Sequence, residues 1–302
     1  MASRGEQIRL SLPVRRQSAA EMTVRLKPDC SKTDTRRYPR HLIAGGSLLL
    51  VVVGAALLAP ILAQYNPDAI DSSAVLTAPS ALHPFGTDAF GRDLFSRVLF
   101  GARLALRLSL LSAAISALPG TLLGMTAGFY RGWVDQVLSR IIDAWLALPG
   151  LMFALLVIAR TGPSLDGAIL ALGVAGIPSF YRMARGSTIS LSRQPFMEAS
   201  RALGADGITL IFRHILPNLM SVLLVLVTLR LGTYLLAGGS LGFIGLGAQT
   251  PMPEWGVLLA EGRDYIDTAW WMFVFPLAAM TMTVLGYNLF GDGLRDYLGD
   301  CH

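Results

Sequence analysis

The apolar residues of this chain fall in long blocks rather than in the alternation typical of a half-buried strand. A helix of about 20 residues spans a hydrocarbon layer about 30 Å thick, because each residue adds about 1.5 Å. The sequence therefore predicts an all-α, polytopic membrane bundle over residues 41–298, preceded by a basic tail at residues 1–40. Its six predicted transmembrane helices lie at about residues 42–65, 104–129, 141–159, 168–185, 219–246 and 269–289.

Composition supports a membrane protein. Of the 302 residues, 53% are hydrophobic and 15% are charged, whereas soluble domains carry about 25% charged residues. The two cysteines, Cys30 and Cys301, lie near the two ends of the chain and suggest no disulfide framework.

The positive charges gather on one side of the predicted bundle. Ten of the 25 Lys and Arg residues precede His41, and five more lie in residues 182–217. The excess of basic residues places both termini in the cytoplasm. The net charge of +5 then indicates membrane anchoring rather than nucleic-acid binding. The tail lacks the features of a signal peptide, and either Met1 or Met22 fits as the natural start.

The polar stretch at residues 190–218 predicts two short helices. Ser192 suits the N-cap of a first helix that carries Pro195 in its first turn, and Gly204 suits the position just past its end. A second helix should end just before Pro217, because proline disfavours helical geometry in the preceding residue. Four apolar residues would then need a soluble partner to cover them: Phe196, Leu203, Ile208 and Phe212.

This stretch carries a family resemblance. Residues 195–204, PFMEASRALG, followed by residues 212–218, FRHILPN, resemble the cytoplasmic EAA loop of ABC importer permeases. Further motifs resemble the second permease chain of the dipeptide, oligopeptide and nickel subfamily. They lie at residues 83–88, 91–93, 132–135, 243–247, 254–256 and 288–296.

The resemblance implies a non-catalytic subunit of a heteromeric complex in the bacterial inner membrane. Its implied partners are a homologous second permease, two ATPase subunits that bind ATP and Mg, and an extracytoplasmic substrate-binding protein. This chain would form half the path for di- or oligopeptides and hold no cofactor itself. Relatives also carry nickel chelates, haem or antimicrobial peptides, so the cargo stays open.

In that family the EAA loop docks into a groove of the ATPase and transmits its closure to the membrane helices. Ser200 replaces the more usual second alanine of the motif, which is a small-for-small change. The residues to which the resemblance assigns ATPase coupling are Phe196, Glu198, Ala199, Ser200, Leu203, Gly204 and Pro217.

The residues argue against covalent chemistry in this chain. A phosphate-binding loop needs glycines and a lysine, and neither Lys27 nor Lys32 follows a glycine-rich turn. The G-x-S-x-G pattern at residues 238–242 lies in an apolar block rather than in the strand–turn–helix that a hydrolase requires. Metal ligation is poorly supported, because His83 has no neighbouring ligands in the sequence.

A stand-alone secondary transporter or channel is the alternative from a different class. It predicts intramembrane acid–base relays or inverted repeats, and neither is found in the sequence.

Arg230 lies about eleven residues into the fifth apolar block. An intramembrane charge is costly unless it faces water or a partner. Arg230 could attract a substrate carboxylate in the translocation path. It could instead pair with a carboxylate of a neighbouring helix or of the second permease.

Three glycines in the second block, Gly120, Gly124 and Gly128, recur at four-residue spacing on one helix face. This pattern predicts close packing against another helix.

Overall fold

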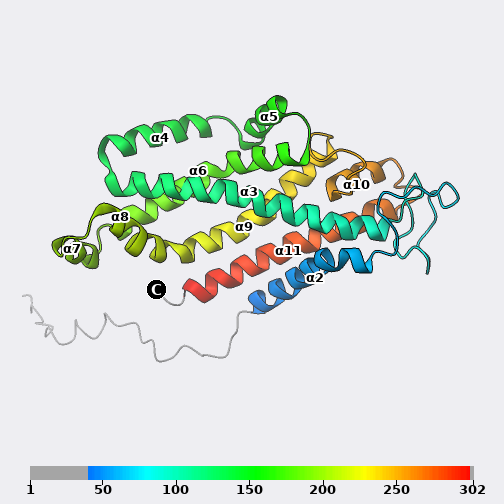
Figure 1. The fold of residues 1–302 in the computed structure, drawn as a ribbon, viewed down its shortest axis with the longest axis horizontal. Helices are drawn as coiled ribbons and strands as arrows, with labels where there is room; N and C mark the ends of the chain where they lie inside the picture. The colour runs from blue at the N-terminus through cyan, green and yellow to red at the C-terminus, as the bar shows by residue number, and fades with distance from the viewer. Residues whose placement is uncertain (1–39, 300–302) are drawn as a thin grey trace, which may run out of the picture. The chain divides into compact units, whose positions relative to one another are not determined.

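The computed structural model describes residues 40–299, and its regular elements there are all helical (Figure 1). The predicted tail, apart from Arg40, and the choice between Met1 and Met22 lie outside the described residues. The helices are α2 (Arg40–Leu62), α3 (Leu94–Tyr130), α4 (Gly132–Leu146), α5 (Gly150–Thr161), α6 (Leu165–Leu191), α7 (Pro195–Ala202), α8 (Gly207–Thr209), a π-helical segment (Leu210–Ile215), α9 (Leu216–Phe243), α10 (Trp255–Arg263) and α11 (Trp271–Gly299).

Five helices within residues 40–299 are long and apolar enough to cross a membrane: α2, α3, α6, the continuous run from α8 to α9, and α11. The predicted all-α membrane fold is therefore confirmed. The third predicted span is different, because α4 and α5 qualify only as a pair bent by 86°. Pro149 causes the break, since proline lacks an N–H and restricts the residue before it.

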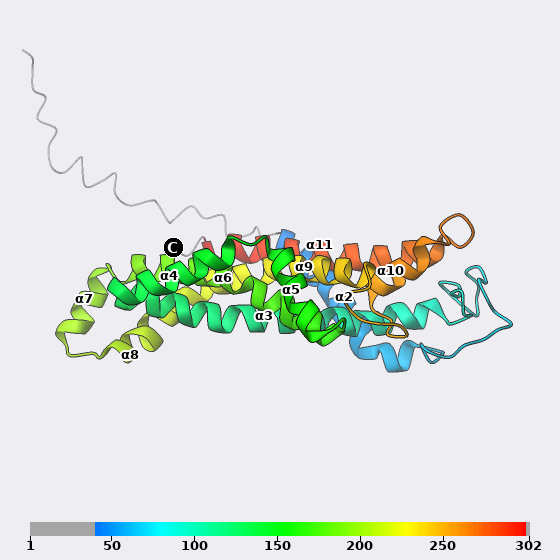
Figure 2. The ribbon, with the colours of Figure 1, turned by 90° about the horizontal axis from the view of Figure 1, so that it is seen from above.

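The most extensive helix–helix contact of the described residues is between α3 and α6, which lie side by side in Figures 1 and 2. Gly124 of α3 allows this approach. A Cβ on Gly124 would lie 2.5 Å from the carbonyl oxygen of Tyr181 and 2.8 Å from the Cβ of Ala184. Gly120 and Gly128 meet the backbone of α6 in the same way, so the predicted close packing is confirmed.

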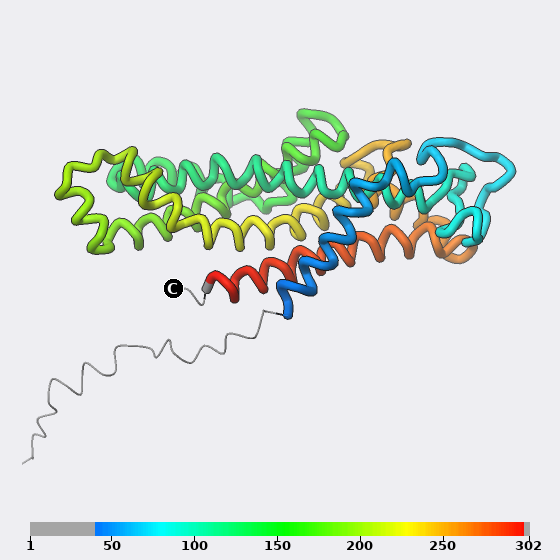
Figure 3. Tube along the Cα trace, turned by 60° about the horizontal axis from the view of Figure 1, so that its bottom comes forward, coloured from blue at the N-terminus to red at the C-terminus, as the bar shows by residue number. Residues whose placement is uncertain are grey.

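The first and last spans cross each other, as the blue and red tubes of Figure 3 show. At the crossing, a side chain on Gly45 would overlap the backbone of Phe290, and one on Gly293 would overlap that of Leu42. Small residues therefore fix the closest approach of α2 and α11.

The G-x-S-x-G segment lies within α9 and serves packing. Gly238 faces Leu108 of α3, and Gly239 faces Met280 of α11. The Ser240 hydroxyl donates to the carbonyl of Leu236, one turn earlier in the same helix, at 2.8 Å. A helical position with this bond does not match a nucleophile elbow.

A buried ionic cluster ties the loop before α3 to α10, at the end of the bundle opposite α7 (Figure 1). Arg97 is 0% exposed, and its guanidinium bonds Asp88 Oδ2 at 3.1 Å and Glu261 Oε2 at 3.2 Å. Arg92 bonds the same two oxygens at 2.6 and 3.1 Å. Two arginines and two carboxylates thus neutralise one another away from water.

Three other residues of the sequence motifs, His83, Asp93 and Glu254, make structural contacts at the same end of the bundle as the ionic cluster. His83 Nδ1 lies 2.9 Å from Asp93 Oδ1, and Asp93 also caps α3 by accepting from the Ser96 N–H at 2.8 Å. Glu254 caps α10 by accepting from the Val257 N–H at 3.1 Å, and burial raises the pKa of its carboxyl. The motifs near residues 83–93 and 254–256 therefore have structural roles in this chain.

Candidate functional site

The first helix of the EAA stretch is α7, and it begins at Pro195. Ser192 does not cap it, because this residue ends α6, where its N–H donates to the carbonyl of Thr188 at 2.9 Å. Gln194 occupies the N-cap position in an extended conformation, as expected for a residue before proline. The prediction for Ser192 was therefore wrong, and a turn separates the two helices.

The end of α7 is as predicted. Gly204 has φ +85°, a conformation that glycine adopts without strain. Its N–H donates to the carbonyl of Arg201 at 2.9 Å, and the next N–H, of Ala205, donates to Ser200 at 3.1 Å. This pair of bonds is the Schellman motif, which satisfies the last carbonyls of the helix.

The second helix does not end before Pro217, so that prediction was wrong. From α8 the chain passes through the π-helical segment directly into α9, and Pro217 lies in the first turn of α9. The Leu216 N–H donates to the carbonyl of Ile211, five residues earlier. This wider turn absorbs the missing N–H and the ring of proline without a break. The EAA stretch is thus joined rigidly to a membrane span.

Four apolar side chains of this stretch remain uncovered, as the sequence predicts, and we term them the coupling face. Leu203 is 89% exposed, Ile208 64%, Phe212 53% and Phe196 40%. The coupling face lies at the end of the helices where α7 and α8 are placed in Figure 1. An exposed apolar patch of this kind marks a surface that a partner covers.

A buried cluster lies beneath the coupling face and holds it to the bundle. Met197 of α7 is fully buried, with Ile211 and Ile215 of the π-helical segment. They pack with Met125 of α3 and Leu219 of α9. The segment that carries the coupling face is therefore packed against the helical bundle through buried apolar side chains.

The other predicted coupling residues are distributed over this region. Glu198 and Ala199 are exposed on α7, whereas Ser200 is half-buried and donates its hydroxyl to the carbonyl of Phe196 at 2.9 Å. Pro217 is exposed at the start of α9, apart from α7 in the chain, and belongs to the rigid connection instead.

Two ring contacts that were not predicted from the sequence join α7 to neighbouring elements. The Arg201 guanidinium lies 5.6 Å from the centroid of the Phe129 ring, and the His214 ring lies 6.4 Å from that of Phe196. A signal for Arg201 exists, because it follows the buried Met197 by four residues and so shares its helix face.

Arg230 is half-buried in α9 and donates to the Ser179 hydroxyl of α6 at 2.7 Å. No carboxylate of residues 40–299 pairs with it. A partner on a neighbouring helix within the described residues is therefore not found.

The described part of the chain offers no metal centre, since no three of its His, Cys, Asp and Glu residues are grouped as ligands. The geometry is that of a helical bundle with an exposed apolar face at one end.

Comparison with known proteins agrees with this geometry. The model of the family described as "Binding-protein-dependent transport system inner membrane component" matches residues 120–300. The dipeptide transport system permease protein DppC of Alkalihalophilus pseudofirmus is 42% identical, over 85% of this chain and 84% of that protein. The glutathione transport system permease protein GsiD of an Escherichia coli strain is 41% identical, over 94% and 96%.

Two further comparisons concern cargo and fold. The probable D,D-dipeptide transport system permease protein DdpC of Escherichia coli K12 is 41% identical, over 85% of this chain and 86% of that protein. A solved structure of the MetNI methionine ABC transporter in an inward-facing conformation superposes with a TM-score of 0.54. It is 20% identical and covers 67% of this chain and 95% of that chain, a likeness that concerns the fold alone.

Proposed function

Because the chain belongs to the family of binding-protein-dependent transport system inner membrane components, the permeases of ABC importers, we propose that its cargo is a small peptide. Three relatives at 39–42% identity support this cargo, since they are named for dipeptide, D,D-dipeptide and glutathione transport. Nickel chelates, haem and antimicrobial peptides are alternatives without such support. The chain contributes half the translocation path and catalyses no reaction of its own.

The proposed assembly pairs this chain with a homologous permease in the bacterial inner membrane, with both termini in the cytoplasm. Two ATPase subunits bind the ATP and Mg, so this chain holds no cofactor, and an extracytoplasmic protein delivers the peptide. The coupling face docks into the ATPase. Its rigid connection through the π-helical segment to α9 then transmits ATPase closure to the membrane.

The observation that carries this proposal is the exposure of Leu203, and Leu203→Asp tests it. A carboxylate buried at the interface without a partner costs several kcal/mol, so we expect ATPase recovery on co-purification to fall more than about tenfold. Peptide uptake into proteoliposomes should fall in parallel. The bundle should stay folded, because Leu203 makes few contacts within it.

The matched control is Ile266→Asp, the same kind of change at an exposed apolar residue near α10. This variant should retain the ATPase. Normal ATPase recovery and uptake with Leu203→Asp would contradict the docking role. Full uptake by this chain alone would instead favour a stand-alone transporter.

We also propose that Arg230 contacts the substrate carboxylate. Its guanidinium is half-buried, bonds only a neutral hydroxyl among the described residues, and keeps donors for an anion. Arg230→Gln should reduce uptake of a dipeptide about tenfold more than uptake of its C-terminal amide, because a charge-assisted bond is lost. Arg103→Gln, at an exposed position of α3, is the control. Equal loss for both substrates would argue for a structural pair with the second permease.

A further inference from the structure

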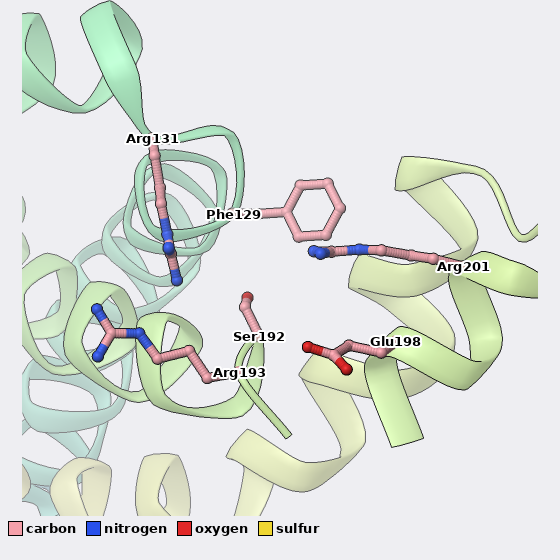
Figure 4. Close-up of a pocket in the computed structure, with 6 residues that line it drawn as sticks. All are labelled: Phe129, Arg131, Ser192, Arg193, Glu198 and Arg201. Carbon is pink, nitrogen blue, oxygen red and sulfur yellow. The ribbon is translucent and has the colours of Figure 1, made fainter. Parts of the chain in front are cut away.

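A pocket of about 320 Å³ lies behind α7, where α3, α6 and α7 come together (Figure 4). This volume is about ten times the share of one water molecule in the liquid, so a small hydrated anion fits. None of the four side chains of the coupling face lines it, but Glu198, to which the family resemblance assigns ATPase coupling, does. The residues that line it are Phe129, Arg131, Ser192, Arg193, Glu198 and Arg201.

Three guanidinium groups and one carboxylate line this pocket. Arg131 follows α3, Arg193 follows α6 and Arg201 lies on α7, so three separate elements supply the positive charge. No ion pair to any of the three occurs among residues 40–299, and Arg131 donates one bond, to the carbonyl of Ile189 at 3.4 Å. With Glu198 counted, the lining carries a formal charge of +2. All three arginines are exposed, so water screens their mutual repulsion, and an anion between them would lower it further.

Ser192 gives an independent indication of a ligand. It is only 7% exposed, and its buried Oγ has no hydrogen-bond partner among the described residues. Buried hydroxyl groups nearly always have a partner. Figure 4 shows the Ser192 hydroxyl turned into the pocket, with the ends of Arg131 and Arg201 directed toward the pocket from opposite sides.

The Arg201 side chain is already held in place for binding. Its guanidinium lies 5.6 Å from the centroid of the Phe129 ring, an arrangement that leaves the N–H groups at the edge of the guanidinium free to donate. Ordering this arginine before the ligand arrives reduces the entropy lost on binding.

We propose that this pocket binds a phosphate group. Arg131 and Arg201 donate to its oxygens, the Ser192 hydroxyl donates a further bond, and Arg193 adds positive charge. Guanidinium groups suit this role because their planar N–H groups match phosphate oxygens. The bound group connects the ends of α3 and α6 to α7 and thereby steadies the helix that carries part of the coupling face. The phosphate is either free inorganic phosphate or the headgroup of an anionic phospholipid. The inference does not rest on the proposed transport function.

Equilibrium binding of radiolabelled inorganic phosphate to the full chain in neutral detergent tests the soluble source. We expect saturable binding that Arg201→Gln weakens by about tenfold or more, because a charge-assisted bond is lost. Ser192→Ala should weaken it by a smaller factor. Glu198→Gln should tighten binding, since it removes the one repelling charge, and damage to the fold would not produce this gain.

The matched control is Arg213→Gln, which removes an exposed arginine of the same stretch that does not line the pocket. Phosphate affinity of this variant should equal that of the unmodified chain.

The lipid source is tested in nanodiscs of phosphatidylcholine alone or mixed with phosphatidylglycerol, by native mass spectrometry of the lipid that stays bound. Retained phosphatidylglycerol that is lost in Arg201→Gln but not in Arg213→Gln supports the headgroup. Saturable inorganic phosphate binding with the same variant pattern supports the free anion. The proposal is overturned if neither ligand binds, or if Arg213→Gln weakens binding as much as Arg201→Gln.

Discussion

Arg97→Met should lower the free energy of unfolding of this chain by about 3–5 kcal/mol, because it leaves the buried Asp88 and the half-buried Glu261 with one cation too few. Arg97 is fully buried and bridges Asp88 and Glu261. Methionine keeps an apolar stem that reaches about as far as the Nε of arginine, but it removes every donor. Arg92 alone would then have to neutralise both carboxylates.

The measurement is denaturant unfolding of the purified chain in mild detergent. Arg263→Gln is the matched control, since Arg263 makes an exposed ion pair with its neighbour Asp264. Such surface pairs contribute about 0–1 kcal/mol. Arg97→Lys should lie between the two, because an ammonium group cannot reach both carboxylates as a guanidinium does. If Arg97→Met unfolded like the unmodified chain, the cluster would not stabilise the fold.

Gly124→Leu should have the second large effect, with a loss of about 3 kcal/mol or more from overpacking. The nearest neighbour of an added Cβ is the Tyr181 carbonyl oxygen at 2.5 Å. This atom belongs to the backbone of α6 and cannot move away as a flexible side chain could. The helices α3 and α6, which share the most extensive helix–helix contact of the described residues, would have to separate.

Gly54→Leu provides the control, because the same substitution should not lower the stability there. Gly54 lies in α2, and an added Cβ there has no atom within 4 Å. Leucine favours helix over glycine by roughly 0.5–1 kcal/mol, so this variant should be neutral or slightly more stable. Unfolding in detergent and the yield of monodisperse protein compare the two variants. Equal behaviour would show that the glycines of α3 do not set the helix spacing.

The sequence predicts the membrane helices well, because a long apolar block has few alternatives to a spanning helix. Prolines are where prediction fails. Pro149 ends a helix and turns the chain by 86°, whereas Pro217 is accommodated inside a continuous one. The local restriction on the preceding residue is the same in both cases. The difference comes from the π-helical turn and from the packing of Ile215 beneath it, which the local pattern does not reveal.

The candidate site divides in the same way. The uncovered side chains at Leu203 and Phe212 follow from an apolar pattern in a polar stretch, so they can be predicted. The phosphate pocket cannot, because Arg131 and Arg201 are 70 residues apart in a sequence that gives no sign of their meeting. The Arg97 cluster is equally hidden, since its carboxylate at Glu261 comes from a distant helix.

The π-helical segment also fixes an angle. In an α-helix each residue advances about 100° around the axis and rises only about 1.5 Å. One residue more or fewer in Leu210–Ile215 would therefore rotate α8 around the axis of α9 by more than a quarter turn while scarcely changing its height. The number of residues in this segment therefore sets the direction, around the axis of α9, in which Ile208 and Phe212 face a partner.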